Sequence, residues 1–262
     1  MIESFLPVVR GAVLLLLSSL LLVVVAPASS SEVNQQTKPG IDFQSPDIQS
    51  LQQDDFQNPG ILAVDFGKSA AHSGAGKENK SCHDCHESFA GIAAEFPNYN
   101  ARLGKIVSLS SQIMACREDH QHAKPAAYES NLIQSMSAYV AYQSRGLPFK
   151  QVSDELGIAL GRGEAYYYKR KGQLNLACHH CHEQNAGKML RGDLISQGVS
   201  TGYPIYRLEW QSIGSLHRRF RSCDIGVRAE PEVIGGQVYT DLELYLRDRA
   251  GELPLSAPAV RR

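Results

Sequence analysis

The sequence predicts a mainly α-helical protein with little sheet, built from two tandem domains related by duplication. A five-residue pattern of two cysteines and one histidine occurs twice, and the two copies lie 96 residues apart. Behind each copy come a polar, glycine-containing stretch, a lone cysteine and an amphipathic helical segment, in the same order. No stretch alternates apolar and polar residues over the length of a strand, so we expect helices and long loops.

The first 28 residues are expected to be a cleavable signal peptide. Arg10 precedes GAVLLLLSSLLLVVVA, a run of sixteen residues without a charge. Ala26-Pro27-Ala28 then presents small residues at the positions that signal peptidase reads. An uncleaved membrane anchor is the alternative, although the apolar run is short for a bilayer span. We therefore expect an exported, periplasmic protein.

The rest of the chain divides by composition and by the repeat. Residues 29–58 are rich in Ser, Gln, Asp and Pro, so we expect a flexible or loosely docked N-terminal arm. The first domain is expected at 59–148, because Pro148 disfavours helix at the residue before it. The second domain is expected at 149–253, followed by a tail at 254–262. A formal net charge of -1 excludes a generally basic surface, so no nucleic-acid partner is expected.

Helical spacing of apolar residues marks three segments within these domains. Residues 129–146 and 240–251 close the first and second domains, and each carries apolar side chains on one helical face. Residues 164–171 form a short helical pattern that leads into the second cysteine pair. These helices would surround each repeated motif.

Both repeated motifs have the form Cys-x-x-Cys-His, which is the attachment site of a c-type haem. Two thiols add across the porphyrin vinyl groups, and the adjacent imidazole reaches the iron as proximal ligand. The first motif consists of Cys82, Cys85 and His86, and the second of Cys178, Cys181 and His182. A zinc site, thioredoxin-like dithiols and ordinary disulfides are alternatives, but each leaves the repeated histidine to coincidence. We therefore expect two covalently bound c-type haems in two cytochrome c-like domains.

The distal ligands of the two irons are less directly marked. No methionine follows Met189, so the downstream candidates in the second domain are His217 and Cys223. The candidates in the first domain are Met114, Cys116, His120, His122 and Met136. Cys116 and Cys223 occupy similar places in the two domains, and a thiolate on iron would lower its reduction potential. A Cys116–Cys223 disulfide and a buried inert thiol are the alternatives.

Cys223 lies among four arginines, namely Arg218, Arg219, Arg221 and Arg228. Guanidinium groups lower the pKa of a nearby thiol and offer forked donors to a sulfur oxyanion. The alternative is that most of them are solvated or paired with Asp224 and Glu230. We expect one or two of them at the site, where they would suit redox chemistry on a small dianion.

The sequence resembles SoxA, the dihaem subunit of the SoxAX cytochrome of bacterial thiosulfate oxidation. The resemblance covers roughly residues 60–251. Besides CHHCH, it rests on RGDLISQG (191–198), GYPIYRLEWQSIGSLHRRFRSCDIGVRAEP (202–231) and the terminal YLRDRAG. It does not depend on the haem motifs alone.

The resemblance implies an enzyme, an L-cysteine S-thiosulfotransferase, that works as a heterodimer with SoxX, a small c-type cytochrome. It would couple thiosulfate oxidatively to a cysteine of the carrier protein SoxYZ, giving a cysteine S-thiosulfonate. Two electrons would pass through haem to a cytochrome c acceptor. It further implies that Cys223, found as a persulfide in the family, is the distal ligand of the second haem, opposite His182. Arg219 would bind substrate, with Arg218 as a further candidate.

In the first domain the resemblance implies that Cys82, Cys85 and His86 hold the other haem, with Cys116 opposite. A second redox station and a mainly structural role both fit this haem. Two other functions compete for the whole chain. One is a dihaem electron carrier without substrate chemistry, and the other is a dihaem peroxidase or a tetrathionate-forming thiosulfate dehydrogenase.

Overall fold

The computed structural model describes Met1 and residues 36–262, and residues 37–262 form one compact unit. The expected signal peptide, residues 1–28, lies outside the described residues except for Met1. In the described part of the chain, none of the helices combines the length and the apolar character that a membrane span requires. The unit is mainly helical, and its three sheets contain only two or three strands of two or three residues each. The prediction of a helical protein with little sheet is confirmed.

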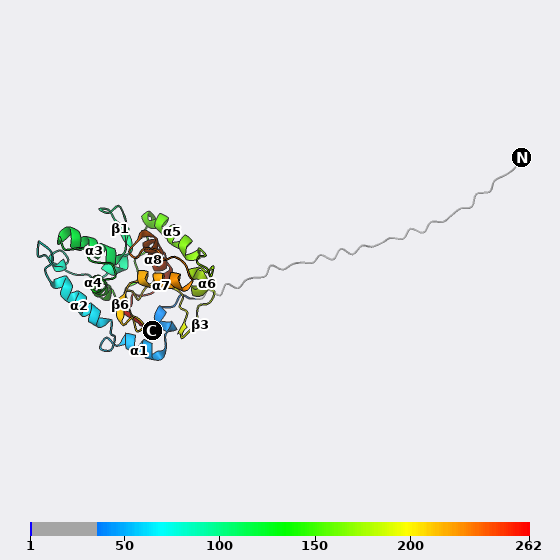
Figure 1. Cartoon of the computed structure of the whole chain (residues 1–262), viewed down its shortest axis with the longest axis horizontal. Helices are drawn as coiled ribbons and strands as arrows, with labels where there is room; N and C mark the ends of the chain where they lie inside the picture. Colours follow the sequence, from blue (N-terminus) through cyan, green and yellow to red (C-terminus); the bar gives the residue numbers. More distant parts are fainter. Residues whose placement is uncertain (2–35) are drawn as a thin grey trace. The chain divides into compact units, whose positions relative to one another are not determined.

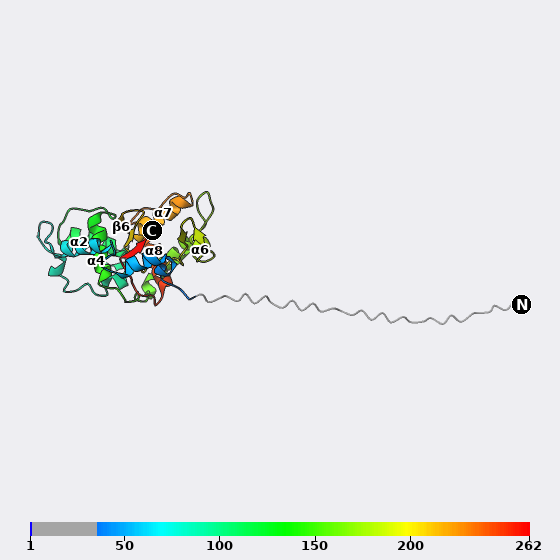
Figure 2. The ribbon, with the colours of Figure 1, turned by 90° about the horizontal axis from the view of Figure 1, so that it is seen from below.

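The first motif lies among helices at one end of the unit. The elements there are α2 (Ile61–His72), η2 (Cys82–Asp84), η3 (Ile92–Glu95), β1 (Asn98–Asn100), β2 (Lys105–Val107), α3 (Leu109–His120) and α4 (Asn131–Tyr142). Helix α2 packs against α4, and the two views in Figures 1 and 2 place both helices at the same end. The core between them contains Ile133 and Met136 of α4 and Val64 of α2.

The second motif lies at the opposite end of the unit, where Figures 1 and 2 both place α6. The elements of this half are η4 (Asp154–Leu156), α5 (Gly157–Tyr168), α6 (Cys178–His182), β3 (Met189–Leu190), β4 (Asp193–Leu194), β5 (Ile205–Arg207), β6 (Ser212–Gly214), α7 (Leu216–Gly226) and α8 (Gln237–Ala250). Helix α5 packs against α8, and Tyr167, Leu242 and Tyr245 lie in the core between them. The helical segments expected from the spacing of apolar residues are thus present, with α5 longer than predicted.

Several backbone features recur in the two halves at the same interval of 96 residues. A short bridge precedes each motif, joining Ala75 to Lys80 and Lys171 to Leu176. Gly76 and Gly172 in these loops have φ values of 66° and 68°. The asparagines three residues later, Asn79 and Asn175, have φ values of 48° and 50°. The loops GKENKSCHDCH and GQLNLACHHCH therefore share one backbone path into the motif.

Residues 37–58 and the tail at 254–262 lie within the compact unit, and the division of the chain into two domains stays a prediction. Residues 37–58 contain η1 (Gly40–Phe43) and α1 (Pro46–Gln53), and the Gln52 side chain accepts a hydrogen bond from the Val260 N–H at 3.1 Å. The tail forms β7 (Ala259–Arg261), which pairs with β5 in parallel, while β6 pairs with the other edge of β5. Val260 is fully buried. The buried residues of the tail are mostly small apolar ones. The prolines of the tail suggest an exposed segment, so composition does not reveal this burial.

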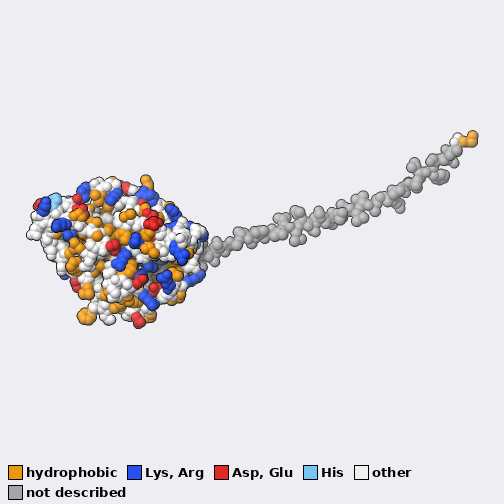
Figure 3. Space-filling view, in the orientation of Figure 1, with side chains coloured by type: hydrophobic (Ala, Val, Ile, Leu, Met, Phe, Trp, Pro, Cys, Tyr) orange, Lys and Arg blue, Asp and Glu red, His pale blue; other side chains and the backbone are white. Residues whose placement is uncertain are grey.

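The surface carries both signs of charge. Figure 3 shows basic and acidic side chains interspersed over the visible face, with apolar side chains scattered among them. This distribution agrees with a net charge of -1. Any anion-binding role must therefore come from a local group of cations.

Candidate functional site

The second motif is held so that one nitrogen of its histidine stays free for a metal. Cys178 to His182 form the short helix α6. The His182 Nδ1 atom lies 2.7 Å from the Ser196 carbonyl oxygen, so it carries the proton and donates it there. This fixes the tautomer and leaves the Nε2 lone pair available as an axial ligand. A Cβ atom at Gly198 would lie 2.9 Å from the His182 ring, so only glycine lets the backbone at residue 198 approach the ring so closely.

Helix α7 brings Cys223 opposite this histidine. Ser215 caps the helix by accepting a hydrogen bond from the Arg218 N–H at 3.0 Å. Burial raises the pKa of the Cys223 thiol, but the Arg219 guanidinium and the nearby His182 outweigh burial and lower it below its ordinary value. His182 and Cys223 are thus neighbours. An imidazole nitrogen and a thiol of lowered pKa therefore lie at the same site, and both are side chains that could hold a haem iron.

The motif thiols behave differently from Cys223. Burial raises the pKa of Cys178 to about 12. Burial also raises the pKa of Cys181, with the nearby Cys223 adding to it. All six cysteines are free of disulfides. The two motif thiols are therefore available to form thioethers with a porphyrin, whereas Cys223 is the thiol of this site whose pKa is lowered.

Arg219 is the arginine that the fold places at the site. It precedes Cys223 by one turn of α7, so the two side chains share one face of the helix. The pKa of Arg219 is raised, chiefly by the Cys223 thiolate and against the effect of burial, with Tyr203 contributing. Tyr203 lies near both Arg219 and the half-buried Arg261 of β7, and desolvation lowers the pKa of Arg261 to about 10. The site therefore has a cationic lining beside the Cys223 thiol.

The other arginines of this stretch point elsewhere. Arg218 stacks on the Trp210 ring, with its guanidinium carbon 4.2 Å from the ring centroid, and donates to Ser212 Oγ at 3.2 Å. Arg221 and Arg228 are exposed. Of the four arginines, the structure places Arg219 beside Cys223, whereas Arg218 is committed to Trp210 and Ser212; which of them binds substrate stays a prediction.

His217, the other candidate distal ligand of the second haem, is occupied in the interior. It is fully buried. Its Nδ1 atom accepts a hydrogen bond from the Gly235 N–H at 3.0 Å, and its Nε2 atom lies 2.9 Å from a Glu243 carboxylate oxygen. The Nδ1 atom is thus hydrogen-bonded and the Nε2 atom faces Glu243, away from the second motif, which leaves Cys223 as the candidate beside His182.

A buried charge network fixes the end of α7 behind Cys223. Asp224 accepts hydrogen bonds from Tyr166 OH at 2.9 Å and Tyr239 OH at 2.7 Å. The same carboxylate pairs with Lys171, which lies in the loop that leads into the second motif. The network therefore ties the motif loop to the turn that carries Cys223.

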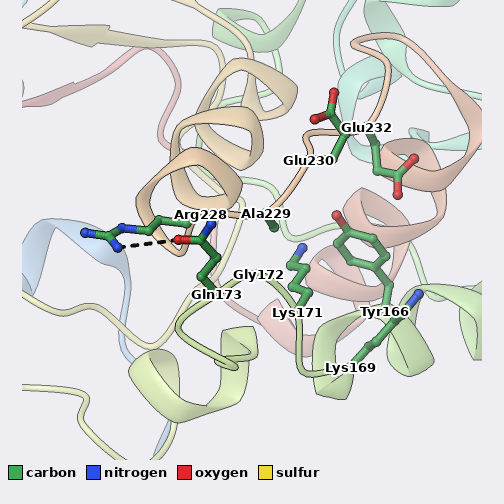
Figure 4. Close-up of a pocket in the computed structure, with 9 residues that line it drawn as sticks. All are labelled: Tyr166, Lys169, Lys171, Gly172, Gln173, Arg228, Ala229, Glu230 and Glu232. Carbon is green, nitrogen blue, oxygen red and sulfur yellow. Dashed lines mark hydrogen bonds between the residues drawn. The ribbon is translucent and has the colours of Figure 1, made fainter.

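A pocket of about 460 Å³ adjoins this network. Figure 4 shows Lys171 beside Tyr166 in it, while Arg228 extends away from them toward Gln173. Glu230 and Glu232 also line it, so the pocket presents both signs of charge. Because Cys223 does not line this pocket, we assign the candidate chemistry to the His182–Cys223–Arg219 group.

The first motif is assembled differently. Burial raises the pKa of Cys82, and the nearby Cys116 of α3 adds to this rise. Gln112, one turn before Cys116, donates a hydrogen bond to its sulfur at 3.3 Å. His86 is exposed, and its ring centroid lies 5.4 Å from that of Phe89. Among residues 36–262 the structure shows no interaction that joins His86 to Cys116.

The other candidate distal ligands of the first haem lie around this motif. Met136 is buried in α4, where its sulfur lies 3.9 Å from a guanidinium nitrogen of Arg117. Met114 is partly buried against the first core, and His120 and His122 are exposed. No group of three or more His, Cys, Asp or Glu side chains within the described chain is placed to bind a metal ion directly. The zinc alternative therefore has no support in the described geometry.

Sequence reasoning missed the residues that orient the site. Ser196 acts through its backbone carbonyl and Gly198 through its close approach to His182. Lys171 reaches Asp224 across a long separation in sequence, and Gln112 bonds through its side-chain amide to Cys116. One signal was available for part of this set. The pattern Gly-x-x-Asn-x-x-Cys precedes both motifs and would have indicated the shared loop.

Comparison with known proteins agrees with this geometry. Residues 67–149 match the family model described as SoxA/TsdA, cytochrome c domain. The chain is 35% identical over 227 residues to the L-cysteine S-thiosulfotransferase subunit SoxA of Pseudaminobacter salicylatoxidans, covering 84% of this chain and 79% of the relative. It is 34% identical over 227 residues to the subunit of the same name from Rhodovulum sulfidophilum, covering 85% and 79%.

A solved structure is similar over the same part of the chain. The crystal structure of SoxXA from P. pantotrophus aligns with a TM-score of 0.83 and 30% identity, covering 86% of this chain and 87% of that one. The match to a cytochrome c domain implies a covalently bound c-type haem as cofactor.

Proposed function

The chain belongs to the SoxA family, and from this premise we propose that it is the haem-bearing subunit of an L-cysteine S-thiosulfotransferase. The finer proposal is that it couples thiosulfate to a cysteine of a carrier protein of the SoxYZ kind. The single observation that carries this proposal is the pairing of Cys223 with Arg219 opposite His182. An electron carrier has no need of a thiolate beside a free guanidinium.

We propose that two haems are bound, one at each motif. Cys178 and Cys181 would form the thioethers of the second haem, with His182 and Cys223 as axial ligands. Cys82 and Cys85 would form those of the first, with His86 and Cys116 as axial ligands. The fit is best supported at the second motif, where Ser196 holds the His182 tautomer that leaves Nε2 free. When bound, the haem supplies an acceptor that takes electrons one at a time and passes them on to a cytochrome c.

The chain's own residues would perform the binding and orientation. Arg219 carries a permanent positive charge and forked donors, so it can hold the sulfonate oxygens of thiosulfate beside the Cys223 sulfur. The carrier's thiolate and the terminal sulfur of thiosulfate then form a sulfur–sulfur bond. Their combined charge of three falls to one in the cysteine S-thiosulfonate, and two electrons leave. The local cations Arg219 and Arg261 favour the approach of both anions.

The partner proposal follows the family. A small c-type cytochrome of the SoxX kind would complete a heterodimer with this chain. The crystal structure of SoxXA supports it, because the matched chain there covers most of the present one. Export of the protein to the periplasm remains a proposal from the N-terminal sequence.

We also propose that the two halves descend from one duplicated cytochrome c-like unit. The recurrence of Gly76 and Gly172, and of Asn79 and Asn175, supports it at the level of the backbone. A second support comes from helix packing. Gly67 meets the Ser135 backbone where α2 crosses α4, and Gly163 meets the Asp241 backbone where α5 crosses α8.

The experiment that tests the function uses the haem-loaded chain with its small cytochrome subunit, thiosulfate and the carrier protein. We expect mass spectrometry to show a thiosulfate-derived adduct on the carrier cysteine, formed as an added cytochrome c is reduced. Cys223→Ala should abolish the adduct while both haems stay covalently attached. Adduct formation that is unchanged in that variant would remove Cys223 from the reaction, and cytochrome c reduction without any adduct in the wild type would favour a plain electron carrier. Tetrathionate formed without the carrier would favour a thiosulfate dehydrogenase.

A further inference from the structure

The amide of Gln112 connects a surface loop of the first half with the sulfur of Cys116. Its Nε2 group donates to Cys116 Sγ at 3.3 Å, and its Oε1 atom accepts from Asn100 Nδ2 at 2.7 Å. Both side chains are half-buried. The two ends of the amide are therefore engaged, one by sulfur and one by Asn100.

The backbone determines which way round this amide lies. The Asn100 Oδ1 atom accepts a hydrogen bond from the Leu103 N–H at 2.9 Å. A backbone N–H can only donate, so it fixes the oxygen of Asn100 toward Leu103 and the NH2 group toward Gln112. Gln112 must then present its oxygen to Asn100 and its NH2 group to the sulfur. The direction of this series of hydrogen bonds, from Leu103 through Asn100 and Gln112 to Cys116, is therefore set by the Leu103 N–H.

The second half places a different residue at the same position. Ser108 and Ser215 cap α3 and α7 in the same way, and the cysteine follows eight residues later in both helices. The residue one turn before the cysteine is Gln112 in α3 and Arg219 in α7. An arginine has no acceptor and keeps donors free for an anion, whereas Gln112 is neutral and already bonded at both ends.

We propose that Gln112, oriented by Asn100, is a positioning residue that donates a hydrogen bond to a Cys116 ligand of the first haem and raises its reduction potential. A hydrogen bond to an axial thiolate withdraws electron density from the sulfur and so favours the reduced iron. Gln112 itself offers no positive charge to an anion at this position, unlike Arg219 at the equivalent position in α7. This inference rests on the proposed haem ligation of the first motif.

The test is a spectroelectrochemical titration of the haem-loaded full-length chain, combined with electron paramagnetic resonance. Cys116→Met identifies which thiolate signal belongs to the first haem. Gln112→Met keeps the length of the side chain and removes its N–H donor. Asn100→Asp removes the donor that holds the Gln112 oxygen and lets the amide turn over. Gln57→Met, at an exposed glutamine that bonds to Asp54, is the matched control.

We expect Gln112→Met and Asn100→Asp to lower the midpoint potential of the first haem and to shift its resonance signal. The second haem should be unchanged in both, and Gln57→Met should change neither haem. An unshifted first haem in both variants, with haem content and thiolate signal intact, would overturn the inference alone. Equal shifts of both haems would also overturn it. The absence of a haem at the first motif, or of a Cys116-dependent signal, would instead overturn the proposed ligation on which it rests.

Discussion

Arg219 and Cys223 lie one helical turn apart on α7, and each favours the charged form of the other. Burial opposes the Cys223 anion, yet the Arg219 guanidinium and His182 bring the pKa of the thiol below its ordinary value. The thiolate in turn is the main cause of the raised pKa of Arg219. This pair places a thiol of lowered pKa and a permanent cation beside the motif histidine.

Arg219→Gln should lower the rate of thiosulfate coupling by roughly 30- to 150-fold, the value of a lost charge-assisted hydrogen bond of about 2–3 kcal/mol. Arg221→Gln, at an exposed position on the same helix, is the control and should leave the rate within about twofold. The measurement is the initial rate of carrier modification at equal haem content. Equal rates for the two variants would remove Arg219 from the substrate site.

Acid should detach the Cys223 ligand at a higher pH in Arg219→Gln than in the wild type. The folded protein depresses the pKa of this thiol, so the thiolate is present above that pKa and is lost as the pH falls through it. Removing the guanidinium raises the pKa of the thiol, because the strongest influence that lowers this pKa disappears while burial remains. An acid titration followed by the thiolate absorption bands measures this midpoint. A midpoint that stays the same or moves down would contradict the prediction.

The sequence was sufficient for the parts of the site that act as short linear motifs. Two thiols and an imidazole must reach one porphyrin, so their spacing is local and visible, and the cysteines at 116 and 223 stand out by their equivalent positions. The orienting groups could not be predicted in this way. The Ser196 carbonyl is a backbone atom, and the Lys171–Asp224 pair joins residues far apart in the chain. Packing alone decides that Arg219 turns to the thiol.

The terminal segments show a second limit of composition. Residues 37–58 and the tail are rich in polar residues and proline, respectively, yet they pack on one another through β7. Gln52 accepts hydrogen bonds from the Val260 N–H and from Arg261, and Asn58 donates one to the Pro258 carbonyl, so a few long-range contacts join the two segments. Composition reports the average tendency of a segment, whereas docking depends on a few matched atoms.

Lys171→Met should destabilise the fold by about 3 kcal/mol, because it leaves the buried Asp224 carboxylate without its cation. The two tyrosine donors keep the loss from being larger. Lys169→Met is the control, since Lys169 lines the same pocket but is exposed, and it should change stability by less than about 0.5 kcal/mol. Urea unfolding of the haem-loaded protein measures both. Similar midpoints for the two variants would show that the Lys171–Asp224 pair does not hold the motif loop.

Gly172→Ala should cost more than Gly104→Ala although both glycines have nearly the same left-handed backbone, with φ values of 68° and 63°. At Gly104 a Cβ atom would meet nothing within 4 Å, so only the backbone strain of about 1 kcal/mol remains. At Gly172 it would lie 2.1 Å from the Val227 carbonyl oxygen, and the motif loop would have to move from the end of α7. We expect a total of about 2–4 kcal/mol there. Urea unfolding gives the two costs, and the spectrum of the second haem reports whether Cys223 is still its ligand. Equal costs with an unchanged spectrum would mean that the close approach of this loop to α7 is not what positions the thiol.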